Sequence, residues 1–255
     1  MSTPDTLSLV LALATALVAG LVGSFALMKR MTLAGDVISH LALPGLGLAF
    51  LWKINPLIGA AASLAVGIVL IQQLERRSGL ATETSIGVIF VAALAVGTLL
   101  TPREDLIEAL FGGFGEVGWV GFTLGIAGCV AIAGTIYALR HSLILELFSP
   151  DLARSLGIDV NRTELLYLAA FGLTILIGLQ FLGALLVGAM IIVPAATGRN
   201  LARTLDRFLI FSSAASMLSV ALGFGIARWW HLSLGPTTIG VASALFALTL
   251  LRRSE

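Results

Sequence analysis

Residues 33–52 read LAGDVISHLALPGLGLAFLW, an apolar run that Asp36, Ser39 and His40 interrupt. The run has the length of roughly 20 residues that a helix needs to cross a bilayer. An ionised side chain near the bilayer centre costs a few kcal/mol by insertion scales. This stretch therefore predicts a membrane-spanning helix in which a carboxylate and an imidazole, one helical turn apart, have a functional role.

The composition of the whole chain indicates a membrane protein. Of the 255 residues, 58% are hydrophobic and 11% are charged, and the mean hydropathy is +1.04. A soluble domain carries about 25% charged residues, so we expect an all-α, polytopic transmembrane helical bundle that forms a single domain over residues 1–255. A net charge of +1 argues against a nucleic-acid partner. Cys129 is the only cysteine, which excludes an internal disulfide and a metal site built from several thiolates.

Further apolar segments of spanning length follow along the chain. They are Leu7–Met28, Pro56–Leu74, Thr84–Thr101, Val117–Leu139, Phe208–Ala227 and Leu232–Leu251. No basic residue precedes the first of them, in contrast to a signal peptide, so we expect it to remain as a spanning helix. Leu165–Gly198 also lacks charge, but at about 1.5 Å per residue it is far longer than a hydrocarbon core of about 30 Å. We expect it to break at Gly178–Gly183, which gives nine spans, or eight if one half lies as a half-helix.

Lysine and arginine residues set the expected orientation, because they are enriched in cytoplasmic loops. With nine spans and the N-terminus outside, the outer side keeps only Lys53, Arg103 and Arg228 of the 15 basic residues. The inner loops then contain Lys29, Arg30, Arg76, Arg77, Arg140, Arg154, Arg162, Arg199, Arg203, Arg207, Arg252 and Arg253. With eight spans the arginines between positions 199 and 207 would move outside, so the charges favour nine.

Asp36 and His40 are the candidate metal ligands of the chain. Residues i and i+4 lie on one face of a helix with Cβ atoms about 6 Å apart, so both side chains can reach one ion. An oxygen and a nitrogen donor suit Mn²⁺, Fe²⁺ or Zn²⁺ rather than Cu⁺. Pro44 and Gly45 follow, and a proline inside a spanning helix frees a backbone carbonyl and permits a hinge. The alternatives are that Asp36 only caps the helix start while His40 bonds a neighbour, or that the pair relays protons.

The inner loop His141–Asn161 contains a second functional candidate. Ser149 is a good N-cap, Pro150 suits the first helical position, and Gly157 can adopt the left-handed turn that ends a helix. Apolar residues at every fourth position give this short helix an apolar stripe beside a polar face. The stripe consists of Phe148, Leu152 and Leu156. Such a helix either lies on the inner surface of its own subunit or inserts into a cytoplasmic partner.

The sequence contains no motif typical of an enzyme. A GxxxxGK[ST] phosphate loop is absent, so we expect ATP hydrolysis to take place in a separate chain. The HExxH motif and a nucleophile elbow are absent as well. We therefore expect a transport subunit and not an enzyme.

These stretches resemble the membrane permeases of the ABC-3 family, the bacterial importers of zinc, manganese and iron. Residues 31–45, MTLAGDVISHLALPG, resemble the GDAxSHxxLPG helix of the family, and residues 86–90 resemble its GI/V-x-F motif. Residues 183–197 resemble its GALLVxALLIxPAATA stretch, with Gly198 where the family has Ala. Residues 148–157 resemble the coupling segment of the family, a version of the EAA---G pattern through which importers bind their ATPases. The residues that carry this last resemblance are Phe148, Asp151, Leu152, Ala153, Leu156 and Gly157, with Asp for Glu and Leu152 for Ala.

The resemblance implies a permease like that of a type II ABC importer, working as a homodimer. Its implied partners are two copies of a cytoplasmic ABC ATPase and an extracytoplasmic metal-binding protein, and its location is the bacterial plasma (inner) membrane. It also implies metal contact at Asp36 and His40. No permanently bound cofactor is implied, since the Mn, Zn or Fe ion is the cargo.

The residues and the resemblance together predict a permease that moves a divalent transition metal inward, driven by a separate ATPase. An ion-coupled secondary transporter would also bury a carboxylate, but it usually has paired discontinuous helices in repeated halves, of which the sequence gives only weak signs. An ABC permease for chelated iron or cobalamin would share the architecture without a need for an intramembrane Asp–His pair. The same pair disfavours a membrane scaffold without transport activity.

Overall fold

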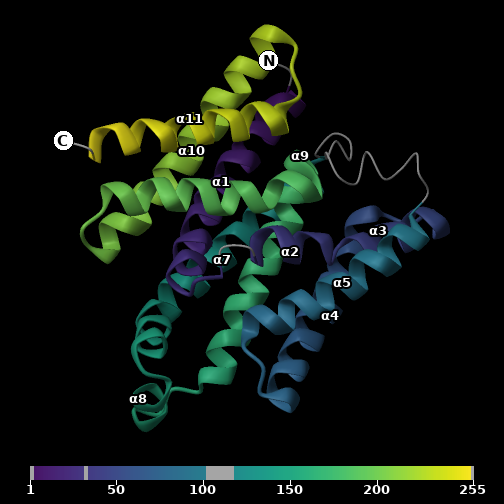
Figure 1. The fold of residues 1–255 in the computed structure, drawn as a ribbon. Helices are drawn as coiled ribbons and strands as arrows, with labels where there is room; N and C mark the ends of the chain where they lie inside the picture. The colour runs from purple at the N-terminus through teal and green to yellow at the C-terminus, as the bar shows by residue number, and fades with distance from the viewer. Residues whose placement is uncertain (1–2, 32–33, 102–117, 254–255) are drawn as a thin grey trace.

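The computed structural model of the protein describes residues 3–31, 34–101 and 118–253, and most of them are helical (Figure 1). The helices are α1 (Thr3–Met28), α2 (Ala34–His40), α3 (Leu43–Trp52), α4 (Pro56–Ser78), α5 (Thr82–Leu100), α7 (Trp119–Phe148), α8 (Pro150–Ser155), α9 (Val160–Leu201), α10 (Leu205–Trp230) and α11 (Leu234–Arg253). These described ranges contain no strand. The all-α bundle that the composition predicts is confirmed.

Eight segments within the described ranges are long and apolar enough to cross a bilayer, and each corresponds to a span expected from the sequence. Their ends follow local sequence signals, as α4 illustrates. Asn55 Oδ1 accepts a hydrogen bond of 2.9 Å from Leu57 N at its start, with Pro56 in the first turn. Gly79 ends the helix with a φ of 66°, the left-handed conformation that glycine adopts without strain.

The second span is interrupted between α2 and α3, whereas the sequence placed the interruption at Pro44–Gly45. Pro44 lies in the first turn of α3, where its missing N–H is not needed. The carbonyl one turn before it belongs to His40, and α2 ends there because a proline cannot donate a hydrogen bond to it. Ser63 of α4 donates a hydrogen bond of 2.5 Å to the Leu41 carbonyl, so a neighbouring helix satisfies the backbone at the break.

The long helix α9 does not run straight. A Cβ at Gly178 would lie 2.5 Å from Val187 Cγ2, although nine residues of straight helix span about 13.5 Å. Figure 1 shows the resulting two arms of α9, which point in clearly different directions. The break expected at Gly178–Gly183 is therefore present as a sharp bend. The first arm, Val160–Gln180, has spanning length, whereas the second arm, Leu186–Leu201, is shorter, and its crossing stays a prediction.

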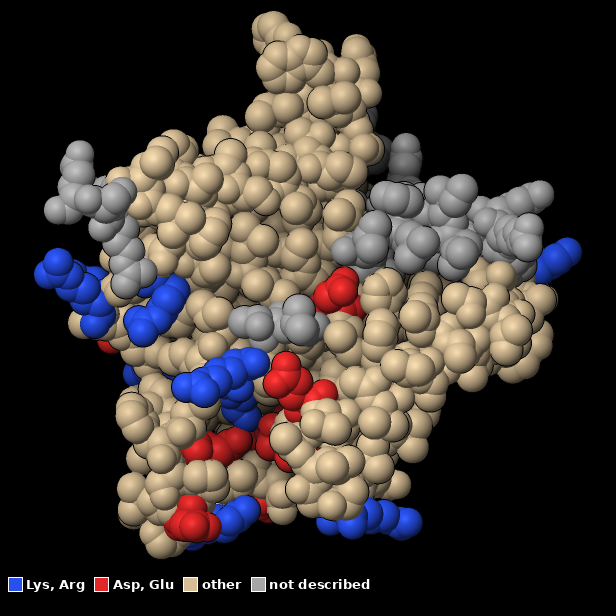
Figure 2. Space-filling model, viewed as in Figure 1, with Lys and Arg blue, Asp and Glu red and all other residues tan. Residues whose placement is uncertain are grey.

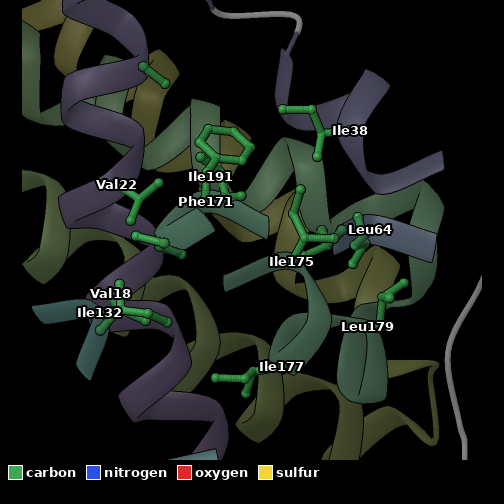
Figure 3. Close-up of a cluster of buried hydrophobic side chains, with 14 of the residues drawn as sticks. Val18, Val22, Ile38, Leu64, Ile132, Phe171, Ile175, Ile177, Leu179 and Ile191 are labelled. Carbon is green, nitrogen blue, oxygen red and sulfur yellow. The ribbon is translucent and has the colours of Figure 1, made fainter. Parts of the chain in front are cut away.

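The core of the bundle lies where α1, α2 and both arms of α9 meet (Figure 3). Val22 of α1, Ile38 of α2, and Phe171 and Ile191 of α9 are all fully buried. By contrast, α4, α5, α7 and α11 expose many large apolar side chains, which suits helices whose outer face meets lipid. The helix that carries the candidate metal ligands is thus packed at the centre of the protein and not at its lipid-facing edge.

Basic residues that are distant in sequence gather at one end of the bundle. Arg199 and Arg203, near the end of the second arm, line the same groove as Lys29, Arg30 and Phe148. Figure 2 shows charged side chains over the lower part of the viewed face and none over its uppermost part, where α10 ends and α11 begins. The second arm therefore ends beside the residues that directly follow α1, whereas its crossing of the membrane, and with it the count of nine spans, stays a prediction.

The four tryptophans lie at helix ends that the sequence assigns to the outer side. Trp52 ends α3, Trp119 begins α7, and Trp229 and Trp230 end α10. Their exposed fractions lie between 64% and 82%. Tryptophan is enriched at the boundary between lipid and water, so exposed tryptophans at these helix ends fit the expected outer side of a membrane protein.

Candidate functional site

The short helix α2 lies across the second arm of α9. A Cβ at Gly188 would come within 2.5 Å of Asp36 N and 2.6 Å of Asp36 Cα. Only a residue without a side chain allows two helix backbones to approach this closely. Ser39 Oγ also donates a hydrogen bond of 2.6 Å to the Asp36 carbonyl. The backbone that carries the candidate ligand is therefore held in place by α9.

Asp36 and His40 face each other from successive turns of α2. Asp36 Oδ1 lies 3.8 Å from His40 Nε2, and the two side chains are 52% and 12% exposed, respectively. The imidazole packs against Phe90 of α5, with 5.7 Å between the ring centroids. Its Nδ1 is buried and has no hydrogen-bond partner in the described part of the chain. The carboxylate is thus open on one side, while packing holds the imidazole.

The geometry of this pair suits two ligands of one ion. Oxygen and nitrogen ligands lie about 2.0–2.2 Å from Zn²⁺, so two of them can be up to about 4.2 Å apart, and the distance of 3.8 Å falls within this limit. Among the described residues, no three His, Cys, Asp or Glu side chains lie close enough to hold a metal ion together. Within the described ranges, Asp36 and His40 are therefore the two acidic or imidazole donors that meet at this place.

The predicted hinge residues Pro44 and Gly45 are tightly packed. Gly45 of α3 and Gly59 of α4 cross in backbone contact, since a Cβ on either would collide with the carbonyl oxygen of the other. A Cβ at Gly97 of α5 would lie 2.7 Å from Leu43 Cβ and 3.2 Å from Pro44 N. The break between α2 and α3 is therefore enclosed by α4 and α5, and any bending there requires these helices to move with it.

The coupling segment forms the short helix α8, as its capping residues predict. Ser149 Oγ accepts a hydrogen bond of 3.2 Å from Leu152 N at the start of the helix. At its end, Gly157 adopts a φ of 81° and donates a hydrogen bond of 3.0 Å to the Arg154 carbonyl. This is the arrangement expected of a glycine that ends a helix, so the start and the end of α8 are both confirmed.

The apolar stripe of the coupling segment points away from the bundle. Phe148, Leu152 and Leu156 are 86%, 49% and 61% exposed, whereas Ala153 is fully buried. Asp151 lies on the exposed side of the same helix. Since soluble surfaces rarely expose large apolar side chains side by side, this stripe has the character of an interaction surface.

Two residues at the site were not singled out from the sequence. Gly188 lies within the stretch of residues 183–197, and a glycine inside a spanning segment signals a close helix contact without revealing the partner helix. Glu146 is a buried acidic residue in the last turn of α7, and it forms an ion pair with Lys29. The sequence used Lys29 only as a marker of orientation.

Comparisons with known proteins agree with this architecture. The model of the ABC 3 transport family matches residues 6–253. The chain is 34% identical over 249 residues to the manganese import system permease protein ScaB of Streptococcus parasanguinis, with 94% of this chain and 87% of ScaB covered. It is 28% identical over 238 residues to the high-affinity zinc uptake system membrane protein ZnuB of Haemophilus influenzae, with 91% of each chain covered. Among solved structures, PsaBC from Streptococcus pneumoniae in complex with Fab matches with a TM-score of 0.83 and 28% identity, over 97% of this chain and 91% of that chain.

Proposed function

The chain belongs to the ABC 3 transport family, and from this premise we propose that it is the membrane permease of an importer that carries a divalent transition metal ion inward past Asp36 and His40. A separate ATPase chain supplies the energy. The cargo is Mn²⁺, Zn²⁺ or Fe²⁺, because one carboxylate and one imidazole suit all three ions. The names of ScaB and ZnuB, which describe manganese import and zinc uptake, support the same class of cargo.

One observation carries the proposal: a half-exposed carboxylate inside an apolar helix. Asp36 is 52% exposed within Ala34–Trp52, a segment of spanning length. Facing lipid, an ionised carboxylate would cost a few kcal/mol, so its open side has to face water, a cation or a polar surface of another chain. His40 adds a nitrogen donor at 3.8 Å. A pathway for a divalent cation satisfies both requirements.

In this proposal a second copy of the chain completes the site. Two copies related by a twofold axis would bring two Asp36 carboxylates and two His40 imidazoles to one point. Four oxygen and nitrogen donors are enough to replace most of the water lost by a divalent ion. Because none of these donors is a thiolate, retention of a borderline or hard ion stays weak enough for release.

The ATPase docks on α8 in this proposal. The exposed stripe of Phe148, Leu152 and Leu156 supplies the apolar contact, and the capped helix presents it rigidly. An extracytoplasmic metal-binding protein delivers the ion at the opposite end of the bundle, in the bacterial inner membrane. ScaB and ZnuB, named as components of an import system and an uptake system, support such an assembly.

Reconstitution tests the proposed function. The permease, purified with its ATPase from the native membrane, is inserted into vesicles, and uptake of radioactive manganese, zinc and iron is measured with and without ATP. We expect ATP-dependent uptake of at least one of these ions. Uptake driven by a proton gradient without the ATPase would instead favour a secondary transporter. Uptake of chelated iron or cobalamin without uptake of free ions would contradict the assigned cargo.

A further inference from the structure

A buried ionic network lies at the end of the bundle that carries α8, with Lys29 at its centre. Lys29 Nζ lies 2.8 Å from Glu146 Oε1 and 3.4 Å from Glu164 Oε1. The side chains of Lys29, Glu146 and Glu164 are only 6%, 9% and 14% exposed. The network therefore ties the end of α1 to the last turn of α7 and to the beginning of α9.

The network also reaches the link between α4 and α5. Thr82 Oγ1 donates a hydrogen bond of 2.8 Å to Glu75 Oε1 and lies 3.5 Å from Glu164 Oε1. Lys29 Nζ lies 5.4 Å from the ring centroid of Tyr167 on α9, which adds a favourable contact between the cation and the ring. Figure 2 shows acidic and basic side chains gathered together in the lower part of the viewed face.

The acidic residues of this network are not arranged as a metal site. No three His, Cys, Asp or Glu side chains within the described ranges lie close enough to share an ion. The ammonium of Lys29 already occupies the position between Glu146 and Glu164. The network thus holds together the end of α1, the end of α7 and the beginning of α9.

Glu146 and Lys29 lie at the bases of the two functional elements. Glu146 is in the last turn of α7, two residues before Phe148 and three before the Ser149 cap of α8. Lys29 directly follows α1 and precedes α2, which carries Asp36. A single contact of 2.8 Å therefore connects the docking helix with the segment that leads into the candidate metal pair.

Glu164 provides a second connection to the same pair. It lies on the first arm of α9, and the second arm of the same helix touches the Asp36 backbone at Gly188. A movement of Lys29 relative to Glu164 would shift α1 against α9, and α9 is the helix on which α2 packs. Both connections to the metal pair thus pass through one ammonium group.

We propose that Lys29 and Glu146 are positioning residues that transmit the movement of α8 to Asp36. The inference rests on the proposed function: an ATPase bound at α8 displaces the last turn of α7, and the ion pair carries this displacement to the end of α1 and the start of α2. Stability alone does not require such a pair, since apolar residues of similar volume often replace a buried ion pair without loss. A short ionic contact resists separation, because separation leaves an uncompensated buried charge.

The test separates stability from coupling by comparing single and triple variants in the reconstituted complex with the ATPase. The readouts are the melting temperature and the amount of metal taken up per ATP hydrolysed. Lys29→Met leaves the Glu146 carboxylate unpaired, so both readouts should fall. The triple variant Lys29→Met/Glu146→Gln/Glu164→Gln removes the ammonium together with both carboxylates that it pairs with and should recover most of the melting temperature. Its uptake per ATP should nevertheless stay about fivefold or more below that of the wild type.

A triple variant with a recovered melting temperature and the wild-type ratio of uptake to hydrolysis would overturn the inference. Where the Lys29 variants do not assemble, Glu146→Gln alone decides in the same way, because it keeps the shape of the side chain and removes its charge. Glu83→Gln, an exposed acidic residue beside Thr82, is the matched control and should keep the wild-type ratio. The same vesicles also test the proposed function separately. Absence of ATP-driven metal uptake by the wild-type protein would contradict the proposed function and not the inference about Lys29 and Glu146.

Discussion

Two pairs of ionisable groups lie within this bundle, and they differ in how completely the chain satisfies them. Lys29 and Glu146 approach to 2.8 Å with 6% and 9% of their side chains exposed. Asp36 and His40 stay 3.8 Å apart, and Asp36 is 52% exposed. The first pair joins helices that are distant in sequence, whereas the second lies within one short helix.

Lys29–Glu146 is a closed pair, because each buried charge has its partner within the chain. Asp36–His40 is an open pair, because its carboxylate is half exposed. A buried pair with a short ionic contact mainly fixes the helices that carry it. An open pair in an apolar span has a carboxylate without a close partner, which is favourable only when something else supplies the missing charge. We therefore expect Lys29–Glu146 to hold and position the helices, and Asp36–His40 to bind the proposed cargo.

The largest expected effect is on transport, from variants of the open pair. Asp36→Asn keeps the shape of the side chain and removes its charge, and His40→Ala removes the nitrogen donor. Uptake of radioactive metal at matched expression should fall to the level of vesicles without permease, because each variant lacks a ligand. The stability of Asp36→Asn should change by less than about 1 kcal/mol, as for other exposed pairs. Wild-type uptake in both variants would leave the pair as a helix cap.

Variants of the closed pair Lys29–Glu146 should lower stability more than variants of the open pair do. Lys29→Met leaves the buried Glu146 carboxylate without its partner, and a loss of this kind costs about 3–5 kcal/mol of unfolding free energy. Unfolding of the purified permease in mild denaturant measures it. A loss no greater than that of Asp36→Asn would remove the distinction between the two pairs.

The contact between Gly188 and Asp36 positions the open pair Asp36–His40 without contributing a ligand, so it tests positioning separately from metal binding. Gly188→Val forces a side chain into the backbone of α2 and should lower uptake, together with a loss of about 1–3 kcal/mol of stability. Gly134→Val is the matched control, since a Cβ there meets no atom within 4 Å. Equal uptake by the two variants would show that the position of α2 is not set by α9.

The smallest effect on stability is expected at α8. Gly157→Val places a branched residue at a φ of 81°, which costs about 1–2 kcal/mol. Leu152→Glu places a charge in the exposed stripe and should leave the stability of the bundle almost unchanged. Both variants should insert normally but uncouple uptake from ATP hydrolysis. Undiminished co-purification with the ATPase, together with full transport, would exclude docking at α8.

Features that depend on neighbouring residues were predictable from the sequence. The caps of α8, the common face of Asp36 and His40, and the bend near Gly178 follow from local chemistry and from the thickness of a bilayer. The interruption of the second span was also expected, although it begins before Pro44, because the proline withdraws its hydrogen bond from the preceding turn.

Contacts between distant segments were not predictable in the same way. Lys29 and Glu146 are 117 residues apart, and no periodicity links a lysine after one span to a glutamate at the end of another. Gly188 carried the general signal of a small residue in a membrane helix, but its partner at Asp36 depends on how α9 bends. Helix crossings of this kind are set by packing of the whole bundle.

Counting the metal ions bound to the purified permease shows whether Asp36 and His40 form half of a site shared by two chains. Mn²⁺ serves as the probe, since its paramagnetic resonance reports both the amount bound and the ligands. We expect one Mn²⁺ ion for every two wild-type chains, with a nitrogen coupling from imidazole in the resonance spectrum. Asp36→Asn and His40→Ala should each lose this ion. One ion per chain, retained in both variants, would contradict a shared site.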